Sequence, residues 1–394
     1  MAETYAHSVI RNDLLEITPI EISLAKSKLT DENTIAGCRA FYEFNINLLT
    51  DMLANPEQYL IYPGEYETLM ENQPRFAGAR WHDAVDETTP QKLENSRSYS
   101  REERKKFHDY ECNARNKTNY AISFYRSYLF HVCTHGELQD GRFVIKKDDY
   151  AKAVKGFGGA KYFKKKDMPA RLQAFAHVGL VISEDENQVV FEYPEDKNML
   201  PVMAEMSRQA EKNKDYGKFN FMWCNFGQLT EKYKPNFEDV IRILSPDNRK
   251  SAEELNNYAK SMKISPKPYL PWKLSYNYKG QVVFRTYANN GNLNITAIHC
   301  VDCKDIEIFA RQLENESVEP KDFCIKHLNH CIDCGQCHNP PGENGVPIKL
   351  LGKDYRVCGW YAGGLIDNPS DTDVEMIKEF IRMRKDFIDI LKSK

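Results

Sequence analysis

Apolar positions recur with a helical period near both ends of the chain. In the N-terminal part, Thr30 or Asp31 precedes a run of apolar residues spaced three or four apart, and this run ends near Pro56. A small polar residue before the first turn and a proline beyond the last are typical of a helix. The same spacing recurs over about 371–392 and predicts an amphipathic C-terminal helix.

Alternation of apolar and polar positions predicts strands in the middle of the chain. The first two predicted strands flank the polar turn 184–187, and the next two flank Lys279-Gly280, a turn typical of a hairpin. Because the strands and the helices occur in separate blocks, we expect an α+β fold. The predicted strands cover residues 180–183, 188–193, 272–278, 281–288 and 293–299.

The chain has 394 residues, which is too long for one ordinary hydrophobic core and predicts a multi-domain protein. Shifts in charge and in the expected elements divide it into a helical N-terminal region, a basic module, a helical connector and an α+β C-terminal domain. These parts cover residues 1–117, 118–198, 199–265 and 266–394, respectively.

Composition indicates a folded protein of the cytoplasm. Apolar residues make up 41% and aromatic residues 12%, which is enough for real cores. No apolar run approaches the roughly 18–20 residues of a membrane helix, and the N-terminus lacks the pattern of a secretory signal. We therefore expect a cytoplasmic protein without a membrane partner, in a reducing environment where disulfides are rare.

Five of the eleven cysteines fall between positions 324 and 358, and this cluster predicts a metal site. The string Cys331-Ile-Asp-Cys334-Gly-Gln-Cys337 spaces three thiols so that a tight turn brings them to one ion. Cys358, followed by a glycine, is the predicted fourth ligand. The two cysteine turns resemble the knuckles of a zinc ribbon, which implies a structural zinc ion. His338 is an alternative to one of the thiolates.

The same string also resembles the cluster-binding motif of ferredoxins, which share the pattern Cys-Ile-x-Cys-Gly-x-Cys. This resemblance implies an iron–sulfur cluster and electron transfer as the alternative. Two-cluster ferredoxins continue with a further Cys-Pro three residues on, whereas His338-Asn-Pro-Pro follows here. This departure from the ferredoxin motif favours zinc over an iron–sulfur cluster.

Cys300-Val-Asp-Cys303 forms a second pair with the same spacing. Together with Cys324 and His327 it supplies four candidate ligands for a second metal, or extra ligands for the first. Ordinary buried thiols explain these positions equally well.

Residues 142–171 carry ten Lys or Arg against three Asp, a net +7 within a chain whose total is −3. Segregated positive charge interleaved with aromatic residues is typical of proteins that contact a phosphate backbone. A lysine-rich solvated face is the alternative interpretation.

The expected order of elements here, helix, basic turn, capped helix and two strands around a polar tip, resembles a winged helix. The resemblance implies that residues 169–177 form the recognition helix and residues 184–187 the wing tip. The implied base contacts are Arg171 and Gln173, and the implied phosphate contacts are Lys161, Lys164, Lys165 and Lys166. The acidic wing tip departs from the pattern and leaves protein contacts as an alternative.

No serine-hydrolase, zinc-protease, dinucleotide-binding or kinase motif occurs in the chain, which favours a protein that is not an enzyme. The favoured hypothesis is a metal-containing, DNA-binding regulator of transcription. The alternatives are an iron–sulfur or redox enzyme that uses the cluster from Cys331 to Cys358, and an adaptor that binds protein.

Overall fold

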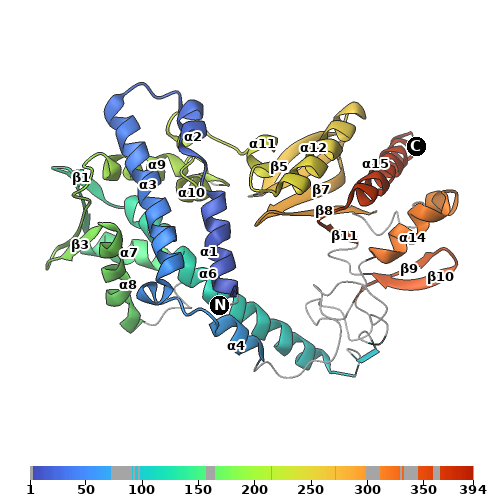
Figure 1. The fold of residues 1–394 in the computed structure, drawn as a ribbon, viewed down its shortest axis with the longest axis horizontal. Helices are drawn as coiled ribbons and strands as arrows, with labels where there is room; N and C mark the ends of the chain where they lie inside the picture. The colour runs from blue at the N-terminus through green and yellow to red at the C-terminus, as the bar shows by residue number, and fades with distance from the viewer. Residues whose placement is uncertain are drawn as a thin grey trace. The chain divides into compact units, whose positions relative to one another are not determined.

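The computed structural model divides the chain into two compact units by its internal contacts (Figure 1). Unit 1 comprises Met1–Asn72 with Cys112–Lys234, and unit 2 comprises Gln73–Glu111 with Pro235–Lys394. The predicted mixture of helices and sheets is confirmed. The structure describes residues 3–71, 91, 94–95, 98–156, 165–213, 215–270, 272–298, 311–328, 331, 345–357 and 364–393.

None of the described helices combines the length and the apolar character that crossing a membrane requires. Unit 1 draws residues from the predicted N-terminal region, the basic module and the connector. Its helices include α1 (Tyr5–Glu16), α2 (Ile20–Ser27), α3 (Glu32–Ala54), α4 (Glu65–Glu71), α9 (Met199–Ala210) and α10 (Gly217–Met222). The long helix α6 (Arg101–Cys133) is the one whose residues both units share.

Helix α3 begins where its sequence predicts. The Asp31 side chain accepts a hydrogen bond of 2.7 Å from the backbone nitrogen of Thr34, which satisfies a donor that the first helical turn would leave open. The helix packs on α9 at Gly37, where a Cβ atom would lie 2.3 Å from the Asn198 carbonyl oxygen. Only glycine permits this approach, so Gly37 fixes how closely the two helices pack.

Residues 137–192 of unit 1 fold into a four-stranded antiparallel sheet with two short helices. Strand order is β1-β2-β4-β3. Strand β2 and helix α7 occupy a stretch that the sequence predicts only as a basic turn, and they form because Phe143, Val144 and Ile145 are buried. The elements are β1 (Glu137–Gln139), β2 (Arg142–Lys146), α7 (Lys147–Gly156), α8 (Met168–Ala174), β3 (Val181–Glu184) and β4 (Gln188–Glu192).

Unit 2 contains a five-stranded antiparallel sheet in the order β11-β8-β7-β6-β5. The predicted hairpin is confirmed: Lys279 and Gly280 have φ values of 45° and 82°, the left-handed pair that a two-residue hairpin turn needs. The strands are β5 (Ser265–Leu270), β6 (Lys273–Tyr278), β7 (Gln281–Asn289), β8 (Asn292–Ile298) and β11 (Gly364–Asp367).

Helices α12 (Pro246–Ser261) and α15 (Asp371–Lys392) pack on this sheet and on each other. The predicted amphipathic C-terminal helix is thereby confirmed, because its apolar stripe, including Ile377, Ile381 and Ile388, is fully buried. Unit 2 also holds α11 (Phe237–Ile241), α14 (Val318–Lys326) and a separate hairpin of β9 (Val346–Leu350) and β10 (Lys353–Val357).

A charged cluster is enclosed in the helical part of unit 1. Arg126 is 1% exposed; it forms an ion pair with Asp13 and donates a 3.1 Å hydrogen bond to the Met222 carbonyl oxygen. The Glu16 carboxylate accepts hydrogen bonds of 3.0 Å from Trp223 Nε1 and from Asn12 Nδ2. Burial, and secondly the neighbouring Asp13, raise the pKa of Glu16 to about 7.

This raised pKa makes the stability of unit 1 dependent on pH. Between pH 4.5 and about 7 the folded protein holds a proton on Glu16 that the unfolded chain has released, so the free energy of unfolding falls as pH rises through this window. We expect Glu16→Gln to remove this loss. The change that it makes in the free energy of unfolding should be more favourable at pH 8 than at pH 4, by up to about 3 kcal/mol.

Urea unfolding at both pH values measures the difference. Glu57→Gln, at an exposed position, is the matched control and should leave the pH dependence of wild type intact. An unchanged pH dependence in Glu16→Gln would contradict the assignment.

Candidate functional site

The predicted recognition segment 169–177 is helical and has one exposed side. Helix α8 continues into the 3-10 turn η4 (Phe175–Val178), which ends at Gly179 with a φ of +80°. Ala174 and Val178 are buried against the rest of the unit. The exposed side carries no acidic, lysine or arginine side chain, and three of its five residues are alanine or proline. It consists of Pro169, Ala170, Gln173, Ala176 and His177.

Arg171 lies on the inner side of this helix. It is 5% exposed and donates hydrogen bonds of 3.3 Å and 3.4 Å to the carbonyl oxygens of Tyr59 and Leu60. Its guanidinium also lies 5.4 Å from the centre of the Phe124 ring. Residues two apart on a helix point about 200° away from each other, so Gln173 faces out while Arg171 faces in. A base contact by Arg171 would require its side chain to leave this buried position and to break both hydrogen bonds.

The positive charge of the segment is partly neutralised. Lys147 pairs with Glu184, and Lys152 pairs with Asp149 at 2.7 Å. Within the described part of the chain, the exposed lysines that have no acidic partner include Lys146, Lys155 and Lys166. Of the other predicted phosphate contacts, Lys161, Lys164 and the side chain of Lys165 lie outside the described residues.

The predicted wing tip is an ordered acidic turn between β3 and β4. The Asp185 carboxylate accepts hydrogen bonds of 2.8 Å and 2.9 Å from the backbone nitrogens of Asn187 and Gln188, which lower its pKa. This carboxylate therefore has a structural role in closing the turn. Residues 184–187 are exposed, and the tip retains its negative charge.

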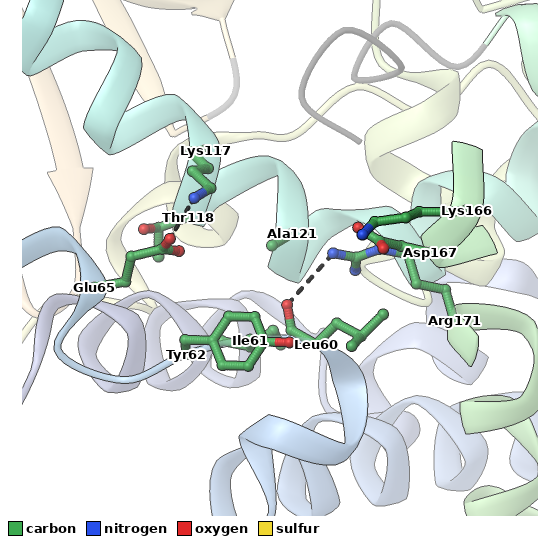
Figure 2. A pocket seen from close by; sticks show the side chains of 10 residues that line it. All are labelled: Leu60, Ile61, Tyr62, Glu65, Lys117, Thr118, Ala121, Lys166, Asp167 and Arg171. Atoms are coloured by element: carbon green, nitrogen blue, oxygen red, sulfur yellow. Dashed lines mark hydrogen bonds and ion pairs between the residues drawn. The ribbon is translucent and has the colours of Figure 1, made fainter. Parts of the chain in front are cut away.

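A pocket of about 340 Å³ opens beside the start of α8 (Figure 2). It lies between the segment 60–65, helix α6 and residues 166–171. Lys117 and Glu65 form an ion pair at one end, while two predicted nucleic-acid contacts, Lys166 and Arg171, line the other end.

Of the four principal ligands of the predicted metal centre, the structure describes one, Cys331. Cys331 donates a 2.8 Å hydrogen bond from its backbone nitrogen to the Arg356 carbonyl oxygen of β10. Gly345, with a φ of +79°, lies so close that a Cβ atom would be 2.5 Å from the Cβ atom of Cys331. Cys331 is thus fixed against the β9–β10 hairpin, whose last residue, Val357, precedes Cys358 in the sequence.

Two further candidate ligands lie on or next to α14. Cys324 is fully buried, and its proximity is the second cause, after burial, of the raised pKa of Tyr355 in β10. The His327 ring centre lies 4.5 Å from that of Phe323. Among the described residues, no three histidine, cysteine or acidic side chains gather as metal ligands do. Cys300, Cys303, Cys334, Cys337, His338 and Cys358 lie outside the described residues.

Sequence reasoning missed the roles of Gly345 and of β10 in positioning Cys331. The signal that would have predicted this hairpin is the Leu351-Gly352 turn between two segments, 346–350 and 353–357, in which apolar residues alternate with other residues. The chain matches no protein-family model, no curated protein and no solved structure.

Proposed function

We propose that this protein binds duplex DNA through the basic module at 118–198. The order α6, β2, α7, α8, β3, β4, with β4 paired between β2 and β3, supports a winged-helix-like arrangement for this module. The observation that carries the proposal is the exposed side of α8 in a segment with three unneutralised lysines. Small side chains on such a helix allow close approach to a groove.

The module offers chemistry for both kinds of contact. Gln173 is exposed and supplies the amide that pairs with the edge of adenine, and the Ala170 and Ala176 methyl groups suit the thymine methyl. Lys146, Lys155 and Lys166 are the proposed phosphate contacts. Phosphate contacts orient a protein on DNA, while base contacts give it sequence preference.

Salt dependence of binding tests the phosphate contacts. We expect the triple variant Lys146→Gln, Lys155→Gln, Lys166→Gln to lower the slope of log Kobs against log salt by about 2–3, because each phosphate contact contributes about 0.9. Gel shifts or fluorescence anisotropy at two or more salt concentrations give the slope. Gln173→Ala should leave the slope alone and weaken binding only to the preferred sequence, by about 1–3 kcal/mol.

Lys152→Gln is the matched control, since it removes an exposed lysine whose charge Asp149 already neutralises. It should change the slope by much less than one third of the change that the triple variant produces. Absence of DNA binding at low salt would overturn the proposal.

Protein binding through the same face is the second candidate, and the acidic turn 184–187 is the observation that favours it. This turn would repel phosphate if it reached the DNA backbone. Charge reversal separates the two: Glu186→Lys should strengthen DNA binding if the turn approaches the duplex, and should weaken a protein complex that depends on its negative charge.

We propose zinc as the structural ion of unit 2, held by Cys331, Cys334, Cys337 and Cys358. The support is that Cys331 is anchored to β10, the strand that leads into Cys358. Four thiolates suit a closed tetrahedral zinc site, in which the ion contributes folding energy. Elemental analysis of anaerobically purified protein distinguishes zinc from iron, and visible absorption with stoichiometric iron and sulfide would favour the redox alternative.

A further inference from the structure

We propose that the pocket beside α8 binds a small organic anion, one with a phosphate or carboxylate head and an apolar body. The pocket belongs wholly to unit 1 and is built from the segment 60–65, helix α6 and residues 166–171 (Figure 2). Its volume of about 340 Å³ falls at the lower end of the range for small-molecule sites. The site stands independently of DNA binding.

The side chains that line the pocket carry a net positive charge, which favours the binding of an anion. Three cationic and two anionic side chains line it, which leaves a net charge of +1. At one end Lys117 is neutralised by its ion pair with Glu65. At the other end Lys166 and Arg171 outnumber Asp167. The excess positive charge therefore lies at the end formed by residues 166–171.

Burial strengthens the interaction at that end. Arg171 is 5% exposed, so its guanidinium acts through a medium of low dielectric. The two carbonyl oxygens that accept its hydrogen bonds hold it in place, and one of these bonds, to Leu60, is drawn in Figure 2. Lys166 is exposed beside it and is able to close over an anionic head. One fixed and one adjustable cation suit phosphate and carboxylate alike.

The wall between the two charged ends accepts an apolar body. Ala121 contributes a methyl group from α6, and Ile61 and Tyr62 face it from the other side (Figure 2). Tyr62 is 52% exposed, so part of its ring is accessible to a ligand. A ring or short aliphatic chain attached to the anionic head would cover this surface.

Ligand-observed NMR titration of the full-length protein tests the proposal with phenyl phosphate, benzoate and inorganic phosphate as probes. We expect at least one of the two ring-bearing anions to bind in about the millimolar range, as its small size allows. Inorganic phosphate should bind more weakly, because it lacks the apolar body. Phenyl phosphate and benzoate distinguish a phosphate-selective from a carboxylate-selective site.

Three variants locate the binding. Lys166→Gln should lower the affinity for the probe about tenfold, since it removes a charge-assisted hydrogen bond. Lys197→Gln removes an exposed lysine of unit 1 that does not line the pocket, and it should have no effect. Ala121→Leu should abolish binding by filling the space. Failure of both ring-bearing probes to bind, or an equal loss from Lys197→Gln, would overturn the proposal, and neither outcome bears on DNA binding.

Discussion

If unit 2 holds the proposed zinc ion, chelation is expected to unfold the hairpin of β9 and β10 while unit 1 stays folded. Structural zinc sites contribute free energies on the order of 10 kcal/mol, because the ligands come together only in the folded state. The hairpin lies at the predicted site: Cys331 hydrogen bonds to Arg356, and Gly345 packs against the Cys331 side chain. Loss of the proposed ion would therefore release the restraint that its ligands place on these segments.

Hydrogen exchange measured with and without a strong chelator reports this result segment by segment. Amides in Val346–Leu350 and Lys353–Val357 should lose protection, whereas those in α3 should keep it. Cys331→Ser should reproduce the effect in untreated protein, and Cys112→Ser, a cysteine on α6 far from the cluster in sequence, should not. Retained protection in protein shown to be free of metal would refute a structural ion.

Replacement of Arg126 by methionine is expected to destabilise unit 1 by about 3–5 kcal/mol at pH 8, the usual result of leaving a buried carboxylate without its cation. Arg126 is 1% exposed. It pairs with Asp13 and lies near the carboxyl of Glu16, whose pKa is raised. The variant should recover part of its stability below pH 6, because protonation of Glu16 removes the repulsion between its carboxylate and Asp13.

Arg39→Met provides the matched control, since Arg39 pairs with Glu21 at 2.8 Å on the exposed surface. Exposed pairs contribute about 0–1 kcal/mol, so this variant should remain close to wild type. The double variant Arg126→Met, Asp13→Asn should be more stable than Arg126→Met alone. Equal losses from the two arginine variants, measured by urea unfolding, would show that Arg126 is not a buried ion-pair partner.

The parts of the fold that sequence predicts are those with strong local signals. The Asp31 cap, the Lys279-Gly280 turn and the apolar stripe of α15 each specify their element within a few residues. Strand β2 has no such signal: its buried core is the short run Phe143–Ile145 inside a lysine-rich segment, so charge obscures it. Packing against β4 makes it a strand.

The candidate sites depend on long-range contacts and are harder to predict. The winged-helix resemblance implies that Arg171 faces DNA, yet the phase set by the buried Ala174 and Val178 turns it inward. The pocket assembles side chains from positions 60–65, 117–121 and 166–171, which no single motif connects. Gly345 is required by the approach of Cys331, fourteen positions away in sequence, and leaves no local pattern.

The order of strands in unit 2 has a consequence for biosynthesis. Strand β8 pairs on one side with β7 and on the other with β11, and α15 follows β11 in sequence. A nascent polypeptide from which β11 and α15 have not yet emerged therefore presents β8 as an open edge and leaves Leu293 and Ile295 without the cover of α15. Such an edge pairs readily with other chains. Ribosome stalling or truncation before β11 should thus produce aggregates rather than a shortened folded protein.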